Sequence, residues 1–266
     1  ERNGVFLLAH LYKQTVIRAP LDLAPNAASQ DQAAELLLDR SMRIQHCHDC
    51  YIYIASPLRK VLITGCNHCT LFVAGAVLVT VDNCERLKVI AGCRRLRVAN
   101  SVDSTLHILT NRQPIFLGEN HDLVLAPFNA LFYDCLSFWR MLRIDRPKNR
   151  WAEPLWVSRS AHSVILSGGV PGQTLMPPQN FFCATIPCNT PQRASAVASQ
   201  ANPCPLPPAY ASALQHKHKQ VLDLRKEIAE TEEAAAAAKT ALHKAIQSKF
   251  KEWLVTSGNL RQVQDL

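Results

Sequence analysis

The sequence has neither a long apolar run nor any of the short motifs that mark common enzyme active sites. Its longest apolar segment, from Leu71 to Val81, falls well short of the roughly 20 residues that a membrane-spanning helix needs. No Gly-x-Ser-x-Gly nucleophile elbow, Gly-x-x-x-x-Gly-Lys-Ser/Thr phosphate loop or His-Glu-x-x-His zinc helix occurs. We therefore expect no transmembrane segment, no cofactor and no stand-alone catalytic activity.

Charged and aromatic residues are also scarce, at 19% and 7% of the 266 residues, whereas apolar residues make up 48%. That composition is typical of a folded chain. Cations nevertheless exceed anions, and the net charge of +8 favours an anionic partner. The low aromatic content and the lack of an RNP-like motif disfavour RNA as that partner. No charged-then-apolar leader follows Glu1, so we expect the ten cysteines to be reduced thiols in the cytoplasm.

Short β-prone segments recur from Met42 onward. The three clearest copies end in Cys47-His-Asp-Cys50, Cys66-Asn-His-Cys69 and Cys84-Glu-Arg-Leu87, at steps of 19 and 18 residues, and weaker copies follow around Asn100 and Asn120. A repeat this short cannot close its own core and must stack on its neighbours. The interval fits three short strands with their corners, and the leucine-rich-repeat consensus is absent. The spacing therefore predicts a mainly β protein built around a right-handed parallel β-helix of about five turns.

Cys47, Cys50, Cys66 and Cys69 form two Cys-x-x-Cys pairs at a spacing typical of a four-thiolate zinc site. The third copy of the repeat, however, has Leu87 at the position of Cys50 and Cys69. Because that position accepts an aliphatic side chain, cysteine there serves as a small apolar residue. Equivalent positions on successive coils stack about 4.8 Å apart, so we predict an interior ladder of thiols and no bound metal.

The chain changes character twice after the repeats. Residues 131–208 join a basic, aromatic stretch to a Gly- and Pro-rich passage, which we expect to be extended or looped and to run along the body. Residues 209–266 lack proline and are rich in helix formers, with Leu214, Val221 and Ile228 at coiled-coil spacing. We thus expect a lead-in over 1–41, the β-helix over 42–130, a packing segment over 131–208, and a C-terminal long helix or helical hairpin over 209–266.

Two groups of cations are candidate partner-binding residues. The first lies on a predicted strand, where alternation places Arg95 and Arg97 on one face next to Arg94. A buried unpaired arginine is too costly, so that face meets solvent or a partner. The second group accompanies aromatic residues and comprises Arg140, Arg143, Arg146, Lys148 and Arg150. For this second group a solvated loop is an equal alternative to a binding site.

The residues around the first group resemble the cofactor-C-like domain family, which includes tubulin-folding cofactor C. The similar stretches are Cys93-Arg-Arg-Leu-Arg-Val-Ala, Asp103-Ser-Thr-Leu-His-Ile-Leu-Thr-Asn-Arg-Gln-Pro-Ile115 and Leu125-Ala-Pro-Phe128. Further segments, including residues 51–59 and 249–258, are similar to the family members of centrosomes and basal bodies. The resemblance covers nearly the whole chain and implies a parallel β-helix.

The resemblance also implies a function. In the GTPase-activating members of the family, an arginine at the position of Arg97 acts as a finger toward the GTP of tubulin or an Arf-like GTPase. This chain has Arg94 and Arg95 where those members have a glutamine pair. The resemblance to centrosomal members implies a non-enzymatic structural protein that binds tubulin or microtubule-associated proteins in the cytoskeleton, at a centrosome, basal body or cilium. The alternative is a GTPase-activating protein for tubulin or an Arf-like small GTPase, with Arg97 as its arginine finger.

Overall fold

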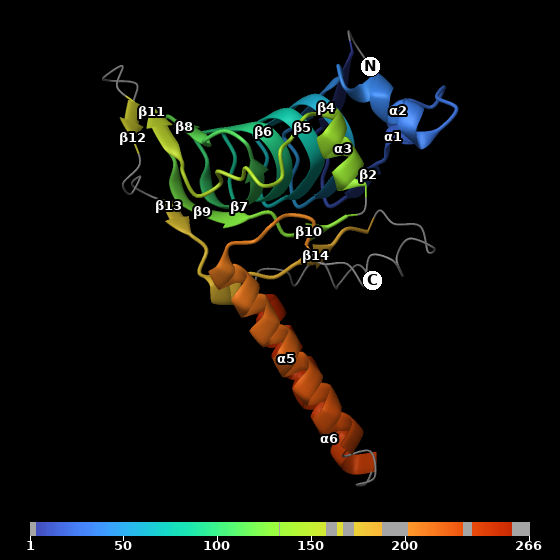
Figure 1. Cartoon of the computed structure of the whole chain (residues 1–266), viewed down its shortest axis with the longest axis vertical. Coiled ribbons are helices and arrows are strands. Elements are labelled where there is room, and N and C mark those ends of the chain that lie inside the picture. The colour runs from blue at the N-terminus through green and yellow to red at the C-terminus, as the bar shows by residue number, and fades with distance from the viewer. Residues whose placement is uncertain are drawn as a thin grey trace. The chain divides into compact units, whose positions relative to one another are not determined.

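The computed structural model describes residues 4–132, 134–157, 164–166, 173–187, 202–230 and 236–256. The chain divides into two compact units, Glu1–Tyr210 and Ala211–Leu266. The first unit is a parallel β-solenoid of about five turns, and helices make up the second (Figure 1). The predicted fold class, mainly β with a C-terminal helical part, is therefore confirmed.

Two stacks of parallel strands, which we call sheet 1 and sheet 2, form the solenoid. Sheet 1 contains β2 (Thr15–Arg18), β7 (Val102–Thr110), β9 (His121–Pro127) and β13 (Gln173–Leu175). Sheet 2 contains β1 (Val5–Ala9), β3 (Ser41–Gln45), β8 (Ile115–Leu117) and β11 (Leu155–Val157), and β12 (Val164–Leu166) adds to β11 in the antiparallel sense. The long strands β4 (Tyr51–Thr64), β5 (Thr70–Asp82) and β6 (Lys88–Ala99) contribute to both sheets. Their register shifts between Ile54 and Pro57 and between Val73 and Ala76, where each strand passes from sheet 1 to sheet 2.

The solenoid begins at β1, so the boundary expected at residue 42 is too late. β1 pairs in parallel with β3, and β2 pairs with β4. The repeat was hidden because this first coil holds two helices, α1 (Pro20–Leu23) and α2 (Gln30–Leu37), within the lead-in expected over residues 1–41. Each begins at a capped turn: the Asp22 carboxylate accepts a hydrogen bond from the backbone N–H of Ala19, and the Ser29 hydroxyl accepts one from Gln32.

Two left-handed residues turn each coil at the corner between sheet 2 and sheet 1. The pairs His46 and Asp49, Gly65 and His68, Asn83 and Arg86, and Asn100 and Asp103 all have φ between 47° and 61°. Such φ values are least costly for glycine and for Asn and Asp, which explains much of the polar composition of these corners. A single bridging residue lies between each pair, such as His48, Asn67 and Glu85, and pairs with its counterpart on the next coil.

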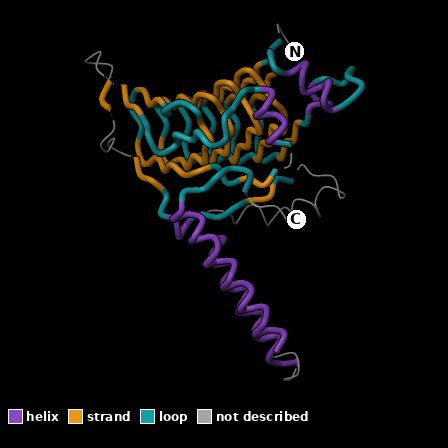
Figure 2. The backbone as a smooth tube through the Cα atoms, in the orientation of Figure 1, coloured by secondary structure: helices purple, strands orange, loops and turns teal. Residues whose placement is uncertain are grey.

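The chain itself covers the outer surface of sheet 1. β10 (Ala130–Leu131), β14 (Ala184–Thr185) and α3 (Cys135–Met141) lie along it, together with the 3-10 turn η1 (Pro178–Asn180) and connecting loops (Figure 2). Phe72 from the sheet packs edge-on against Phe132, and Phe128 packs edge-on against Trp139, in one continuous apolar cluster. Asn129 donates to the carbonyl of Phe182 at 3.0 Å, which fastens this layer across a long sequence separation. Most of sheet 1 is therefore covered on its outer side as well as on its core side.

The second unit contains most of α5 (Pro208–Glu230) and all of α6 (Ala236–Thr256). The first turn of α5 belongs to the solenoid unit, where Tyr210 contacts the rings of Trp151 and Phe181. Val221, at the predicted coiled-coil spacing, and nearby Leu224 are 47% and 46% exposed. The hairpin alternative would start a second helix at Thr231, which lies outside the described residues. Among the described helices, none is long and apolar enough to cross a membrane.

Candidate protein-docking face

The first candidate cations lie on the outer surface of sheet 2. In β6, Leu96 points into the core and is 2% exposed, whereas Arg94, Arg95 and Arg97 are exposed. This is the alternation that the sequence predicted. The structure therefore places all three guanidinium groups on the solvent side of the solenoid.

Register extends this basic group across the neighbouring coils. Arg97 aligns through Thr80 and Leu62 with Arg43, and Arg95 aligns through Leu78 with Lys60. Both Arg43 and Lys60 are exposed. We call the outward surface formed by Arg43, Lys60, Leu62, Leu78, Thr80, Arg95 and Arg97 the sheet 2 face.

Sequence reasoning missed Arg43 and Lys60 because both lie far from Arg95 and Arg97 along the chain. The signal was nevertheless present in the repeat. Cys47 and Ser101 occupy the same corner position on different coils. Arg43 lies four residues before Cys47, and Arg97 lies four residues before Ser101. Aligning the copies outside the cysteine motif would have placed Arg43 in one column with Arg97 and Lys60 in another with Arg95.

No carboxylate among the described residues neutralises the positive charge on the sheet 2 face. Within the residues that the structure describes, no carboxylate oxygen lies within 4.0 Å of the charged nitrogens of Arg43, Lys60, Arg95 or Arg97. The nearby carboxylate of Asp82 accepts a hydrogen bond from Asn100 instead, at 3.3 Å. An array of unneutralised cations attracts anionic partners, and salt weakens this attraction by screening the charges.

The second basic group adjoins the first at one corner of the solenoid. The backbone N–H of Arg112 donates to the carbonyl of Arg94 at 3.1 Å. The neighbouring side chain of Asn111 donates to the carbonyls of Asp145 and Lys148 at 2.6 and 2.9 Å, and it accepts from the N–H of Asp145. Asn111 thus fastens the loop of the second group beside the edge of the first.

The members of the second group differ in availability. Arg140, Arg143, Arg146 and Lys148 are exposed, whereas the side chain of Arg150 pairs with Glu153 and its backbone N–H donates to Thr110. Arg150 therefore serves the packing of its own loop, and the other four remain candidates for binding. The aromatic neighbours Phe138 and Trp139 are buried core residues rather than part of a binding surface.

The cysteines form the interior ladder that the repeat predicted. Cys47, Cys66 and Cys84 stack with Ser101 in one column, and Cys50 and Cys69 stack with Leu87 and Ser104 in another. All eight side chains are at most 3% exposed. Burial raises the pKa of Cys69 to about 12, so this thiol stays protonated at neutral pH.

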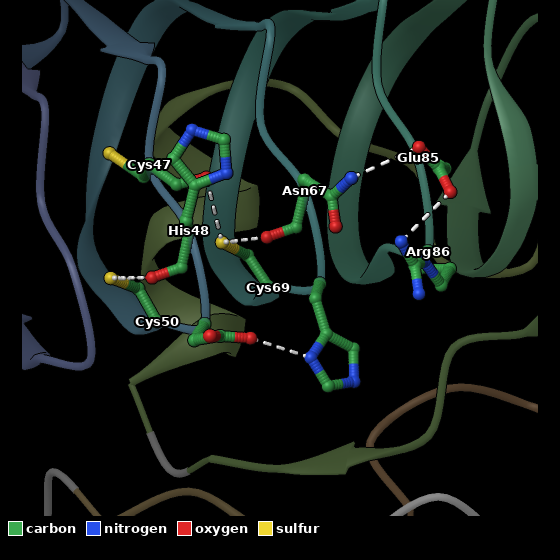
Figure 3. Close-up of polar contacts among 9 residues, drawn as sticks. Cys47, His48, Cys50, Asn67, Cys69, Glu85 and Arg86 are labelled. Carbon is green, nitrogen blue, oxygen red and sulfur yellow. Dashed lines mark hydrogen bonds and ion pairs between the residues drawn. The ribbon is translucent and has the colours of Figure 1, made fainter.

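Hydrogen bonds explain why cysteine and serine share these columns. Cys50 and Cys69 each donate to the carbonyl two residues earlier in the chain, at 3.1 and 3.3 Å (Figure 3). Cys47 makes the same bond to Gln45 at 3.4 Å. Ser101 makes the same bond to Ala99 at 2.8 Å. A small donor therefore satisfies a corner carbonyl inside the core. The histidines beside the thiols point outward, and His68 contacts the Asp49 carboxylate at 2.7 Å.

Comparison with known proteins agrees with this geometry. Residues 39–155 match the sequence profile of the family described as Tubulin binding cofactor C. This part of the chain is similar to that family. It is 29% identical to the TBCC domain-containing protein 1 of Xenopus tropicalis over 238 residues, which covers 88% of this chain and 41% of that protein. The mouse and human proteins of the same name are 27% and 25% identical over 99% of this chain and 43% of their own lengths.

The family resemblance seen in the sequence is thus confirmed, and the chain spans about two fifths of the length of the curated relatives it matches. The matched region contains β3 to β8, and therefore the whole sheet 2 face. The described strands β1 and β2 lie before the matched residues and extend the same stack.

Within the residues that match the family profile, Arg97 occupies the middle of a sheet rather than a loop. Its neighbours in register are Thr80 and Ile115, and no described residue makes a side-chain hydrogen bond to it. A catalytic finger needs neighbouring groups that hold its guanidinium in register with the phosphoryl group. Here Arg95 supplies a second positive charge instead of a positioning amide.

One buried titratable pair lies away from the sheet 2 face, on sheet 1. Burial lowers the pKa of Lys88 to about 8, and its ammonium lies 4.6 Å from the centre of the Phe182 ring. Burial and the charge of Lys88 lower the pKa of His107 to about 3, and the Nδ1 of this fully buried imidazole has no hydrogen-bond partner among the described residues. Both groups lie beneath the covering layer, so we assign them to the core and not to a site.

Proposed function

We propose that this chain is a non-enzymatic scaffold module that binds tubulin or a microtubule-associated protein through the sheet 2 face. The observation that carries the proposal is the bare, unneutralised basic surface of an otherwise covered solenoid. Sheet 1 is covered by the chain itself, whereas Arg43, Lys60, Arg95 and Arg97 stand exposed on sheet 2. Tubulin, with its acidic surface and tails, is an anionic partner of the kind that such a surface attracts.

The family supports tubulin over other anionic proteins, since the matching profile is named for tubulin binding. The cytoskeleton is the cellular setting that this partner implies, and we propose the centrosome, basal body or cilium as the location within it. The rigidity of a stacked solenoid suits a structural role because each coil is fixed by its neighbours.

A GTPase-activating role for tubulin or an Arf-like GTPase is the second candidate. The exposure of Arg97 favours it, because a finger must be free to enter a partner's active site. The environment of Arg97 favours the scaffold, because two further arginines strengthen general attraction to acidic protein without positioning one guanidinium.

Two measurements on the same preparation test these functions. The first is co-sedimentation of the chain with assembled microtubules and its co-elution with tubulin dimers. We expect binding that weakens as salt rises. The second is single-turnover GTP hydrolysis by tubulin and by an Arf-like GTPase, with and without the chain. We expect no acceleration, and an acceleration abolished by Arg97→Ala would replace the scaffold with the second candidate.

A further inference from the structure

Two basic pairs flank an apolar centre on the sheet 2 face, and exposed Leu7 and Ile115 follow beyond Arg43 and Arg97 in the same column. Arg43 on β3 and Lys60 on β4 form one pair, and Arg95 and Arg97 on β6 form the other. Between them lie Leu62 and Leu78, both half-buried, with Thr80 at 8% exposure. Apolar side chains in the middle of a charged surface mark a place where a protein partner can exclude water.

The spacing of these groups constrains the shape of the partner. Arg43 and Arg97 are three register steps apart, and Lys60 and Arg95 are two. At about 4.8 Å a step these separations are roughly 14 and 10 Å. An α-helix repeats its contact face every turn of about 5.4 Å, close to one turn for each coil, and it spans 14 Å with about nine residues. An extended strand repeats its contact face about every 7 Å, so its side chains do not keep register with coils that are about 4.8 Å apart.

We propose that the sheet 2 face docks an acidic amphipathic helix of a protein partner, lying across the coils. Carboxylates at the two ends of the helix pair with Arg43 and Lys60 and with Arg95 and Arg97, and apolar residues between them contact Leu62 and Leu78. The proposal rests on the proposed function in assigning the same face to an acidic protein, but it does not require that protein to be tubulin.

Charge complementarity alone would also admit an unstructured acidic tail or a nucleic acid. Neither makes use of the apolar centre, because both present charge along their whole length. An amphipathic helix places apolar residues at intervals of three and four on one face, which matches the order of basic, apolar and basic groups here. The apolar centre therefore decides in favour of the helix.

The test uses synthetic peptides and the whole chain. The probe is a fluorescent helical peptide of 14 to 18 residues whose central stretch of about nine residues spans the face at about 1.5 Å per residue, with Glu at both ends of that stretch and Leu between them on one face. Two reference peptides have the same charge: one with the probe sequence scrambled, and an oligoglutamate. A single-stranded oligonucleotide of equal charge is the fourth ligand. Fluorescence anisotropy measures the dissociation constant of each.

We expect the probe to bind at least about tenfold more tightly than the three references. The double variant Leu62→Gln, Leu78→Gln should remove that advantage and leave oligoglutamate binding unchanged. Charge reversal at either basic pair should weaken probe binding about tenfold or more. The two variants are Arg43→Glu with Lys60→Glu and Arg95→Glu with Arg97→Glu. The matched control, Lys13→Glu with Arg86→Glu at the solenoid corners, should leave it unchanged. Circular dichroism of each variant confirms the fold.

Several results would overturn the proposal. Equal affinity for the probe and either reference peptide would show that charge alone drives binding. Tighter binding of the oligonucleotide would assign the face to nucleic acid. If the chain binds the probe but not tubulin, the proposed function is wrong and this inference stands. If it binds tubulin but not the probe, this inference is wrong and the proposed function stands.

Discussion

Gly92 is the residue whose substitution tests the packing of α3 on the solenoid most sharply. A Cβ atom at Gly92 would lie 2.4 Å from Nε1 and 2.9 Å from Cε2 of Trp139, and 3.1 Å from the carbonyl oxygen of Ala74. Trp139 is 1% exposed and donates from Nε1 to that same carbonyl at 2.8 Å. The indole cannot retreat without breaking this buried hydrogen bond.

The magnitude follows from two costs. Overpacking a well-filled core costs about 1 to 3 kcal/mol, and leaving a buried carbonyl unbonded costs about 1 to 3 kcal/mol. The φ of Gly92 is not positive, so alanine is not strained there and lowers the entropy of the unfolded chain, which offsets about 0.4 to 1 kcal/mol. We expect Gly92→Ala to lower the free energy of unfolding by roughly 2 to 4 kcal/mol.

Urea unfolding of four chains measures this effect: the wild type, Gly92→Ala, Trp139→Phe and the double variant. Phenylalanine lacks the atoms that the new methyl group meets, so the double variant should be more stable than the sum of the single losses by about 1 kcal/mol or more. Gly75→Ala is the matched control. Its Cβ would meet the Cδ1 atom of Leu142 at 2.8 Å, the mobile end of a side chain, so its loss should be smaller. A neutral Gly92→Ala, or strict additivity in the cycle, would refute the argument.

Three further predictions follow from the core. Cys84→Ser should cost less than about 1 kcal/mol in urea unfolding, because Ser101 makes the equivalent hydrogen bond one coil away, and Cys84→Asp should cost several times more. Elemental analysis should find no stoichiometric zinc, and zinc lost on mutating any of Cys47, Cys50, Cys66 and Cys69 would contradict the interior ladder. His107 stays neutral in the fold because its pKa is about 3, while the unfolded state binds a proton below about 6.5. Stability should therefore fall as pH drops below 6.5, by roughly 2 kcal/mol at pH 5, and His107→Gln should abolish that dependence in unfolding measured at both pH values.

The sequence predicted the solenoid because a repeat leaves the same chemistry at the same interval. Cys50, Cys69 and Leu87 could be placed in one buried column from spacing alone, and the structure confirms that column. The outward direction of Arg95 and Arg97 was also predictable, because strand alternation needs no tertiary contact.

Other features depend on contacts that no local pattern encodes. The first coil escaped prediction because α1 and α2 interrupt its interval between β2 and β3. The layer over sheet 1 rests on bonds such as that from Asn202 to the carbonyl of Phe128, 74 residues apart. Arg43 and Lys60 join Arg97 and Arg95 only through register, so two of the cations on the sheet 2 face came from the structure.

The most direct test of the proposed tubulin binding is its salt dependence in a chain whose three β6 arginines, two on the sheet 2 face and Arg94 beside it, have reversed charge. The variant carries Arg94→Glu, Arg95→Glu and Arg97→Glu, and the control carries the same charge change on α5 as Lys219→Glu, Arg225→Glu and Lys226→Glu. Dissociation constants for tubulin are measured at low ionic strength and at about 0.15 M, where surface charges are screened beyond about 8 Å. We predict that the face variant binds at least about tenfold more weakly than wild type at low salt, that the difference shrinks at the higher salt, and that the control matches wild type. Equal tubulin affinity of the face variant and wild type at low ionic strength would contradict the claim that this face binds tubulin.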